Sequence, residues 1–360
     1  MPLGLRVNDH LYIGNLTGAD PVSSALLPDA PGQLRNALSL LRRAMEGAGL
    51  GLADMRRVMA TVADQADGEA VEDTLRDSLR GAYIGTDVGP LPPGYLVRLD
   101  AFAAHRDDAI RPQLLLADRT PAGVRIGDVM FSPSITAANP ETGEVVGDTA
   151  TQLRAAFTNL DRVLAGAELG RDSILRISGF LRDLGEKDVL NAAMVQAFPD
   201  ATRKPVHKYV PAVLPPGINV SLQVIARDGE NREILEIDGI KHNDPISLGA
   251  RVGNLVVSSR VQGRLAENAE SQAEQLVDSH ARRVLQHIGG DLQHLTQAVW
   301  GIGDPSYADD VARVMERHWP SRLPDIRYIE ADFPHSGLPR LEFIALLDER
   351  SAANPSEPTP

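Results

Sequence analysis

Residues 152–183 read QLRAAFTNLDRVLAGAELGRDSILRISGFLRD, and this stretch decides the fold. Its first half places Leu153, Phe157, Leu160 and Leu164 at helical spacing, which predicts a helix with one apolar face. A glycine-containing turn follows, and the run ILRISGFL then predicts a strand. The stretch therefore predicts a helix that packs on a sheet.

The same order of features occurs twice more in the chain. Residues 33–64 read QLRNALSLLRRAMEGAGLGLADMRRVMATVAD, and residues 272–304 read QAEQLVDSHARRVLQHIGGDLQHLTQAVWGIGD. The three glutamines that open these stretches lie 119 and 120 residues apart, and the closing strands that begin at Leu91, Leu214 and Phe333 lie 123 and 119 apart. Because chance would not preserve both spacings, the sequence predicts three tandem repeats.

Each repeat is predicted to be mixed α and β, with an opening strand, a helix, a strand, a second helix and closing strands. The predicted repeats span residues 1–108, 119–228 and 245–349, with connectors at 109–118 and 229–244. The tail, residues 350–360, is polar and proline-rich, which favours disorder. The expected fold class is therefore α+β.

Composition excludes several functional classes. The 360 residues are 43% apolar and 24% charged, as in globular proteins, and there is no cysteine for a disulfide or a thiolate zinc site. The formal charge of −13 comes without a basic stripe, so we expect no nucleic-acid partner. No apolar run has the roughly 18 residues of a membrane span, and the N-terminal residues do not resemble a signal peptide. We therefore expect a cytoplasmic protein without a membrane partner.

The middle repeat resembles the Rid family of small imine and enamine deaminases, formerly called YjgF or endoribonuclease L-PSP. The resemblance rests on Gly127–Phe131, on NPETGEVVGD (139–148), on residues 152–160 and 165–184, and on the closing LPPGINVSLQVIA. The first and third repeats resemble the family more loosely. The resemblance implies a chorismate-mutase-like α+β fold for each repeat. Family members are typically homotrimers with inner sheets, outer helices and a ligand cleft at each interface. Three fused copies would form a monomeric pseudo-trimer.

The resemblance also implies where a site would lie. Deaminases of this family carry an arginine that holds the substrate carboxylate and a glutamate, on the last strand, that positions water. An ungapped alignment places Tyr83, Val206 and Asp325 at the arginine position. A two-residue gap, which preserves strand parity, places Gly85, Lys208 and Arg327 there instead. The glutamate position holds Asp100, Gln223 and Glu342.

Only the third repeat then combines an arginine with a glutamate, so Arg327 and Glu342 are the predicted catalytic residues. The predicted substrate-binding residues are Lys208, His207, Asn191, Gln223 and Arg260. Structural alternatives stay open for each: a cross-strand ion pair between Arg327 and Glu342, a strand rim at His207 and Lys208, a solvent-exposed Arg260, and a hydrogen-bonding role for Gln223. Asp100 with Arg98 is predicted to be structural.

No metal or cofactor is predicted. His280 and His287 lie seven residues apart on one helix, whereas helical metal sites favour a spacing of three or four. The expected function is that of an enzyme acting on an imine, an enamine or a related carboxylate intermediate, by deamination or by a specialised hydrolysis, cyclisation, dehydration or tautomerisation. The alternatives are a non-catalytic metabolite binder and a chorismatase-like hydrolase.

Overall fold

The computed structural model describes residues 4–7, 10–20, 22–79, 82–88, 91–104, 124–126, 128–132, 134–200, 203–212, 214–229, 232–240, 242, 245–262, 266–321, 323–330 and 337–348. These residues fall into two compact units. The first unit comprises residues 1–168, 180–184 and 211–223. The second comprises residues 169–179, 185–210 and 224–360.

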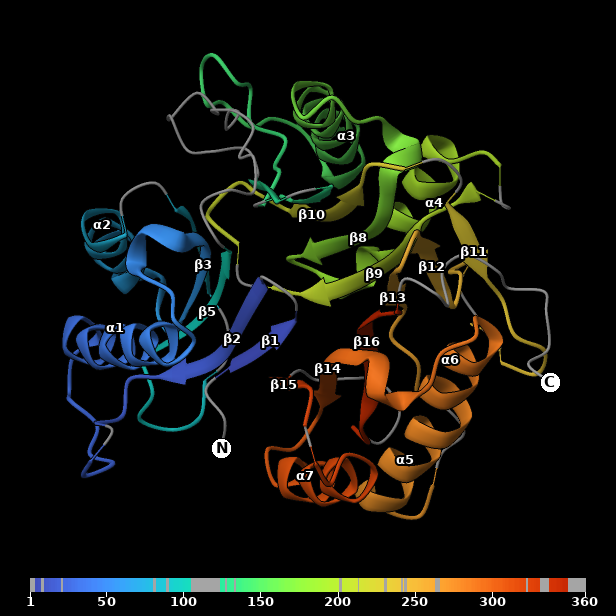
Figure 1. Cartoon of the computed structure of the whole chain (residues 1–360). Helices are drawn as coiled ribbons and strands as arrows, with labels where there is room; N and C mark the ends of the chain where they lie inside the picture. The colour runs from blue at the N-terminus through green and yellow to red at the C-terminus, as the bar shows by residue number, and fades with distance from the viewer. Residues whose placement is uncertain are drawn as a thin grey trace. The chain divides into compact units, whose positions relative to one another are not determined.

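Five strands of each of three sheets follow one order, and the third sheet has a sixth strand, β11, at one edge. Figure 1 labels most of these strands. The first has the order β1-β2-β5-β3-β4, with strands Gly4–Val7, His10–Thr17, Met55–Val62 (β3), Tyr83–Val88 (β4) and Val97–Ala104 (β5). The second has the order β6-β7-β10-β8-β9, with strands Val124–Ile126, Val129–Phe131, Ile174–Leu181 (β8), Val206–Pro211 (β9) and Val220–Arg227 (β10). The third has the order β11-β12-β13-β16-β14-β15, with strands Glu233–Leu235, Gly249–Val252, Leu255–Ser258 (β13), Leu295–Ile302 (β14), Asp325–Glu330 (β15) and Arg340–Leu346 (β16).

Seven α-helices and several short helical turns connect the strands within the described residues. The helices are α1 (Ala30–Gly47), α2 (Gly68–Ser78), α3 (Thr149–Gly166), α4 (Lys187–Ala197), α5 (Ala269–Leu276), α6 (Arg283–His287) and α7 (Tyr307–His318). A π-helical segment at Val277–Arg282 joins α5 to α6, and 3₁₀ turns lie at Leu52–Asp54, Gln65–Asp67, Arg171–Ser173, Leu184–Glu186 and Leu292–His294. The predicted mixture of α and β is confirmed.

An Asx residue begins the first helix after the opening strands of each sheet. The side chains of Asp29, Asp148 and Asn268 accept hydrogen bonds from backbone N–H groups in the first turns of α1, α3 and α5. These caps satisfy donors that a helix N-terminus otherwise leaves unpaired. Each cap lies four residues before one of the glutamines that the sequence comparison aligns.

Two of those glutamines hydrogen-bond the turn before the closing strand and so link their helix to it. The Gln33 amide donates to the carbonyls of Leu27 and Gly94 and accepts from the backbone of Leu96. Gln152 makes the same kind of contacts with Gly147, Gly217 and Asn219. Gln272 is also buried, but it bonds the backbone of Gln262 and Ala266 instead.

The third of these helices contains one residue more than the other two. Gly49 and Glu168, which end α1 and α3 with positive φ, each lie 16 residues after the helix glutamine, whereas Gly289 lies 17 after Gln272. The π-helical turn at Val277–Arg282 accommodates the additional residue, because a π turn adds one residue without breaking the helix. The inner face of the helix therefore keeps its contact with the sheet.

The apolar faces predicted for these helices are buried. In the first unit, Leu34, Leu41 and Met45 of α1 join a core with strands β2, β3 and β5 and with α2. In the second unit, Ala273, Val277 and Val284 pack with Trp300 and Phe343 of the third sheet. Burial of each large apolar side chain contributes about 1.5–3 kcal/mol, so these faces fix the helices on their sheets.

The segment 229–244, predicted as a connector, contains a strand. Strand β11 (Glu233–Leu235) pairs with β12 (Gly249–Val252) in antiparallel register, from Glu233↔Arg251 to Leu235↔Gly249. The prediction missed it because the alternating run is only three residues long. The other connector, 109–118, and the tail, 350–360, lie outside the described residues.

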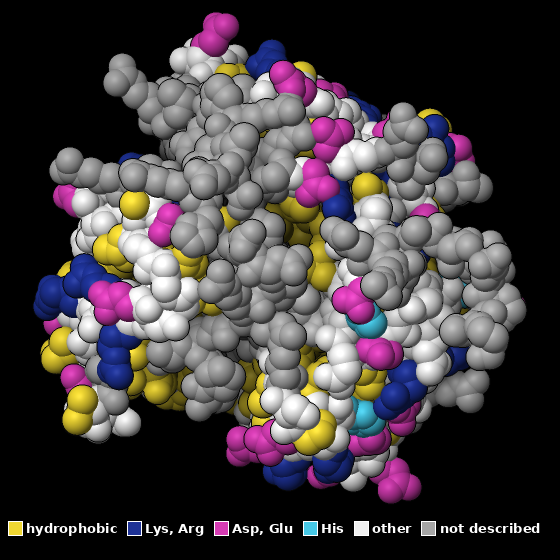
Figure 2. Space-filling model, viewed as in Figure 1, with side chains coloured by type: hydrophobic (Ala, Val, Ile, Leu, Met, Phe, Trp, Pro, Cys, Tyr) yellow, Lys and Arg dark blue, Asp and Glu magenta, His cyan; other side chains and the backbone are white. Residues whose placement is uncertain are grey.

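The visible surface carries both signs of charge. On the face in Figure 2, Lys and Arg side chains are interspersed with Asp and Glu, and they do not form one basic stripe. Within the described ranges, no helix has the length and apolar character that crossing a bilayer requires.

Candidate functional site

Glu342 lies in the middle of β16 with no exposed surface. In the strand register, Val299 of β14 lies opposite both Glu342 and Arg327. In the first sheet, Met59 likewise lies opposite both Gly85 and Asp100. Tyr83 and Asp325, the residues of the ungapped alignment, correspond equally well, because they pair with Arg57 of β3 and Gln297 of β14, two residues earlier in each strand. Residues opposite one another share a face of the sheet, so Arg327, Val299 and Glu342 form one row.

Arg327 is not the direct neighbour of Glu342 that the pairing hypothesis requires. Strand β14 lies between β15 and β16, so the two backbones are about 10 Å apart. The Arg327 side chain is half-buried and acts on the cluster through its charge, which lowers the pKa of Arg176.

Three other cations surround the Glu342 carboxylate. The Lys208 amine donates a hydrogen bond to Oε1, and Nη1 of Arg176 lies 3.7 Å from the same oxygen. Nη2 of Arg260 lies 3.0 Å from Oε2. The exposed fractions of the three cationic side chains are 10% or less. All four residues belong to the second unit.

Different elements bring these side chains together. Arg176 is the third residue of β8, and Lys208 is the third residue of β9. Arg260 lies two residues after the end of β13, next to Val261, which forms an isolated antiparallel bridge with Leu341. Arg260 precedes Val261 and Glu342 follows Leu341, so in this antiparallel bridge the two residues lie opposite one another and the guanidinium reaches the carboxylate.

Burial and mutual charge shift the pKa values in this cluster. Burial would raise the pKa of Glu342, but the charges of Lys208, Arg260 and Arg176 lower it to about 2. Burial, together with the charges of Arg176 and Arg260, lowers the pKa of Lys208 to about 7 against the opposing effect of Glu342. Burial also lowers the pKa of Arg176, and Arg260 and Arg327 act in the same direction. Desolvated groups with shifted pKa values are typical of functional sites.

His207 and Asn191 lie apart from the charge cluster. His207 is fully buried, and its Nε2 lies 2.8 Å from Oδ1 of Asn191 in α4. Neighbouring residues of a strand face opposite sides, so His207 points away from the face that carries Lys208. The structure brings these two predicted residues together, and it separates them from Glu342.

The remaining candidates lie in the first unit. Gln223 donates a hydrogen bond of 3.4 Å to the Ser134 hydroxyl. Asp100 is buried, with an oxygen 3.6 Å from Nε of Arg98.

Arg57 stands in β3 where Arg176 stands in β8. It is the third residue of its strand, and its guanidinium lies over the Phe131 ring, 5.4 Å from the centroid. Phe102 packs on the same ring at 6.3 Å. The guanidinium of this arginine therefore lies over an aromatic ring, whereas that of Arg176 adjoins a carboxylate.

Sequence reasoning missed Arg176. The available signal was a cation inside the apolar run ILRISGFL, where an arginine needs a partner if it is buried. That partner, Glu342, lies 166 positions away, and nothing local in the sequence connects the two.

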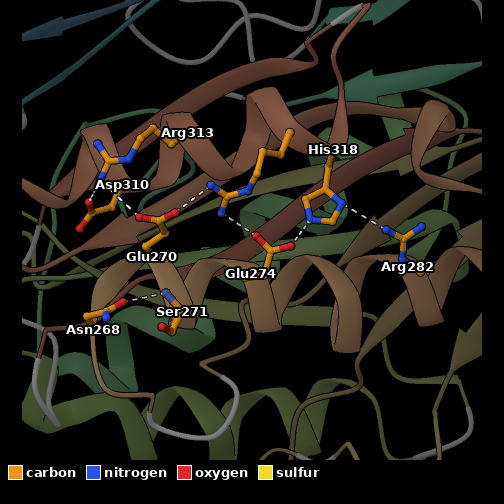
Figure 3. A network of polar contacts seen from close by, with 9 residues as sticks. Asn268, Glu270, Ser271, Glu274, Arg282, Asp310, Arg313 and His318 are labelled. Carbon is orange, nitrogen blue, oxygen red and sulfur yellow. Dashed lines mark hydrogen bonds and ion pairs between the residues drawn. The ribbon is translucent and has the colours of Figure 1, made fainter.

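A second polar network lies between α5 and α7 (Figure 3). Glu274 accepts hydrogen bonds from Arg317 at 2.8 Å and from Nε2 of His318 at 2.5 Å. Arg282 donates to Nδ1 of His318 at 3.1 Å and pairs with Asp278 at 3.0 Å.

The same network contains a group of possible metal ligands. Ligand atoms of Glu274, Asp278 and His318 lie within 4.8 Å of one another. Both Glu274 oxygens already accept from Arg317 and His318, and Asp278 pairs with Arg282. An ion-pair network between two helices accounts for this arrangement.

Residues 119–228 match the family model described as Endoribonuclease L-PSP. A RutC family protein of Aquifex aeolicus is 28% identical over 104 residues, which are 29% of this chain and 83% of the relative. The 2-iminobutanoate/2-iminopropanoate deaminase of Escherichia coli is 28% identical over 106 residues, with 29% and 83% coverage. These matches support a relationship of this segment to the Rid family.

Solved structures of such proteins align with about a third of the chain. E. coli TdcF with bound serine aligns at 25% identity and a TM-score of 0.28, covering 30% of this chain and 87% of TdcF. Yeast Mmf1 aligns at 21% identity and a TM-score of 0.31, covering 33% and 99%.

Proposed function

We propose that the chain contains three tandem Rid-like repeats, residues 1–108, 119–228 and 245–349, which form a monomeric pseudo-trimer with inner sheets and outer helices. Two observations support this proposal: the common strand order of three sheets and the equal spacing of the Asx cap and the glutamine in three helices. Size-exclusion chromatography with light scattering should give a mass near 38.8 kDa. A stable trimer of chains would contradict the proposal.

We further propose that the chain is a Rid-type enzyme acting on an imine or enamine that carries a carboxylate. The observation that carries this proposal is the buried contact of Lys208 with Glu342, flanked by Arg176 and Arg260. A planar guanidinium suits a carboxylate, and relatives of the middle segment are named as deaminases of imino acids.

In the proposed mechanism, Arg176 and Arg260 hold the substrate carboxylate. Lys208 exchanges a proton with the substrate nitrogen, because a pKa of about 7 suits proton transfer near neutral pH. Glu342 orients the Lys208 amine and water. Water adds to the imine carbon, the carbon–nitrogen bond of the resulting carbinolamine breaks, and a 2-oxo acid and ammonia are released.

Glu342 itself is a poor general base. A carboxylate with a pKa of about 2 has little tendency to accept a proton at neutral pH. This property favours the second candidate function, a non-catalytic site that binds a small carboxylate. His207 and Asn191, which bind each other, support the strand of Lys208 in either case.

Turnover of 2-imino acids, generated in situ and trapped as semicarbazones, tests the enzyme. Wild-type protein should accelerate imine loss, and Lys208→Met and Glu342→Gln should lower the rate at least tenfold. Asp100→Asn is the matched control, because Asp100 holds the corresponding position in the first sheet. If the wild-type protein accelerates the loss of none of several imino acids but still binds 2-oxo acids, the result supports the non-catalytic binding site. Chorismate turnover would instead support the chorismatase-like alternative.

A further inference from the structure

The pairing between the opening strand and the closing strand of the third sheet is irregular next to Glu342. The last pair of the β13–β16 ladder and the isolated bridge beyond it are Val257↔Ile344 and Val261↔Leu341. Between these two pairs the opening strand advances by four residues and β16 by three, so the opening strand contains a β-bulge of one extra residue. Arg260 belongs to this bulge, and its Nη2 lies 3.0 Å from Oε2 of Glu342. Bulges are frequent beside active sites, where they redirect a side chain.

The other two sheets have related features at the same place. In the first sheet, the pairs that flank the irregularity are Ile13↔Ala101 and Leu16↔Leu99, so β2 also contains one residue more than β5. In the second sheet, Ser134 and Gln223 flank the bridge that corresponds to the one beside Arg260 and Glu342, and they share a hydrogen bond of 3.4 Å. The contact between these two positions is therefore neutral in the second sheet and charged in the third.

The hydroxyl of Ser258 joins the two strands at the bulge of the third sheet. Its Oγ accepts a hydrogen bond of 2.8 Å from the backbone N–H of Phe343 and donates one of 3.0 Å to the carbonyl of Ser259. A bulge disrupts the strand ladder, and buried backbone groups need partners. Ser258 is fully buried, and a hydroxyl can accept and donate at once, so this one side chain pairs a backbone group of each strand.

We propose that Ser258 is a positioning residue, whose hydroxyl fixes the bulge and thereby holds Arg260 against the Glu342 carboxylate. Phe343 directly follows Glu342, and Ser258 lies two residues before Arg260, so the hydrogen bond between Ser258 and Phe343 adjoins the ion pair on both strands. The inference deepens the proposed function and rests on it for the reaction, in which Arg260 holds the substrate carboxylate. The positioning of Arg260 itself can be measured without turnover.

The Lys208 amine reports the position of Arg260. Burial and the charges of Arg176 and Arg260 lower the pKa of Lys208 to about 7, and Glu342 opposes them. Withdrawal of Arg260 should therefore raise the pKa of Lys208. The chain has only four lysines, so an NMR titration of protein labelled with ¹³C at the lysine ε-carbons can follow each of them. The signal that is absent from Lys208→Met identifies Lys208.

Three variants and a control test the positioning. Ser258→Ala and Arg260→Gln should each raise the titration midpoint of Lys208 by about one pH unit, because each removes a nearby positive charge from the amine. The double variant should show no further rise, since Ser258 acts through Arg260. Ser132→Ala is the matched control and should leave the midpoint unchanged. Ser132 is buried, and it lies three residues before the bridge of the second sheet as Ser258 does in the third.

An unchanged midpoint in folded Ser258→Ala would overturn the inference, because a serine that only stabilises the fold would not move this titration. A lower midpoint would also overturn it, since that result means that Glu342 rather than Arg260 has withdrawn from Lys208. Circular dichroism checks that each variant is folded. If Ser258→Ala does not fold, Ser258→Cys replaces it, because a thiol of similar shape accepts a hydrogen bond only weakly.

The inference and the proposed function can fail separately. If the wild-type protein turns over an imino acid, Ser258→Ala should raise KM more than it lowers kcat, because Arg260 holds the substrate. A raised Lys208 midpoint in Ser258→Ala without turnover of any imino acid by the wild-type protein would retain the inference and reject the enzyme. Turnover with an unchanged midpoint would retain the enzyme and reject the inference.

Discussion

Lys208 donates a hydrogen bond to Glu342 across 134 positions of sequence, and neither side chain is more than 10% exposed. The contact joins β9 to β16 within the second unit. Burial penalises each charge alone, so each side chain depends on the other. The pair therefore bears on stability as well as on the proposed chemistry.

Replacement of Glu342 by glutamine should strongly destabilise the second unit. Arg176, Lys208 and Arg260 would remain buried without their carboxylate, and removal of one partner from such a cluster costs about 3–5 kcal/mol. Urea unfolding followed by circular dichroism measures the loss. Asp100→Asn is the control and should cost less, because its partner Arg98 is 21% exposed. Equal losses in both variants would contradict this account.

The same carboxylate predicts a specific acid response. Its pKa is about 2 in the folded protein and near 4.5 when unfolded, which corresponds to about 3 kcal/mol of stability at neutral pH. Because the folded pKa is the lower one, this stability is present above pH 4.5 and is lost as the pH falls toward 2. The difference in unfolding free energy between wild type and Glu342→Gln should therefore shrink over that range. A constant difference would show that Glu342 does not titrate as described.

Much of the order of helices and strands along the chain could be predicted from the sequence because it depends on local patterns. Helical spacing from Leu153 to Leu164 and the run ILRISGFL place a helix and a strand without any long-range information. Strand parity led to the gapped correspondence of Gly85 with Arg327, and the strand register aligns both this pair and the ungapped pair, Tyr83 with Asp325.

The arrangement of the site depended on contacts that no local pattern encodes. Parity places Arg327 and Glu342 on one face, but it does not show that β14 separates them. Arg176 and Lys208 reach Glu342 from a distant part of the chain. The π turn is different, because the extra residue between Gln272 and Gly289 was visible in the sequence.

Replacement of Gln152 by alanine should cost about 2–4 kcal/mol. The change leaves the backbone groups of Gly147, Gly217 and Asn219 without their partner, and an unpaired backbone group costs about 1–3 kcal/mol where water does not replace the amide. Gln33→Ala should behave alike, because its amide makes the same set of contacts. Arg35→Ala, at an exposed position of α1, is the control. A loss no larger than that of Arg35→Ala would contradict the proposed role of these amides.

Replacement of Glu168 by glycine should stabilise the protein. Glu168 has a φ of 58°, in the left-handed region, whereas glycine occupies the corresponding positions 49 and 289. Relief of this strain, about 1–2 kcal/mol, exceeds the entropy cost of a glycine, so a net gain of roughly 0.5–1 kcal/mol is expected in thermal unfolding. Gly49→Ala should lose about 1 kcal/mol, and because no atom lies within 4 Å of the added Cβ, that loss reports backbone strain alone. A destabilised Glu168→Gly variant would show that the Glu168 side chain outweighs its backbone conformation.

His280 should make the second unit sensitive to mild acid. Burial, and to a smaller extent the charge of His242, lowers the pKa of His280 to about 3, and the His280 ring centroid lies 5.6 Å from that of Phe343. In the unfolded chain the imidazole is protonated below about pH 6.5, whereas in the folded chain it is protonated only below about pH 3. The free energy of unfolding therefore decreases as the pH is lowered between these values, by at most about 1.4 kcal/mol per pH unit. His280→Leu should remove that slope, measured as urea midpoints from pH 7 to pH 4. His287→Leu, seven residues along and exposed, should leave the slope unchanged. An unchanged slope in His280→Leu would assign the acid sensitivity to other groups.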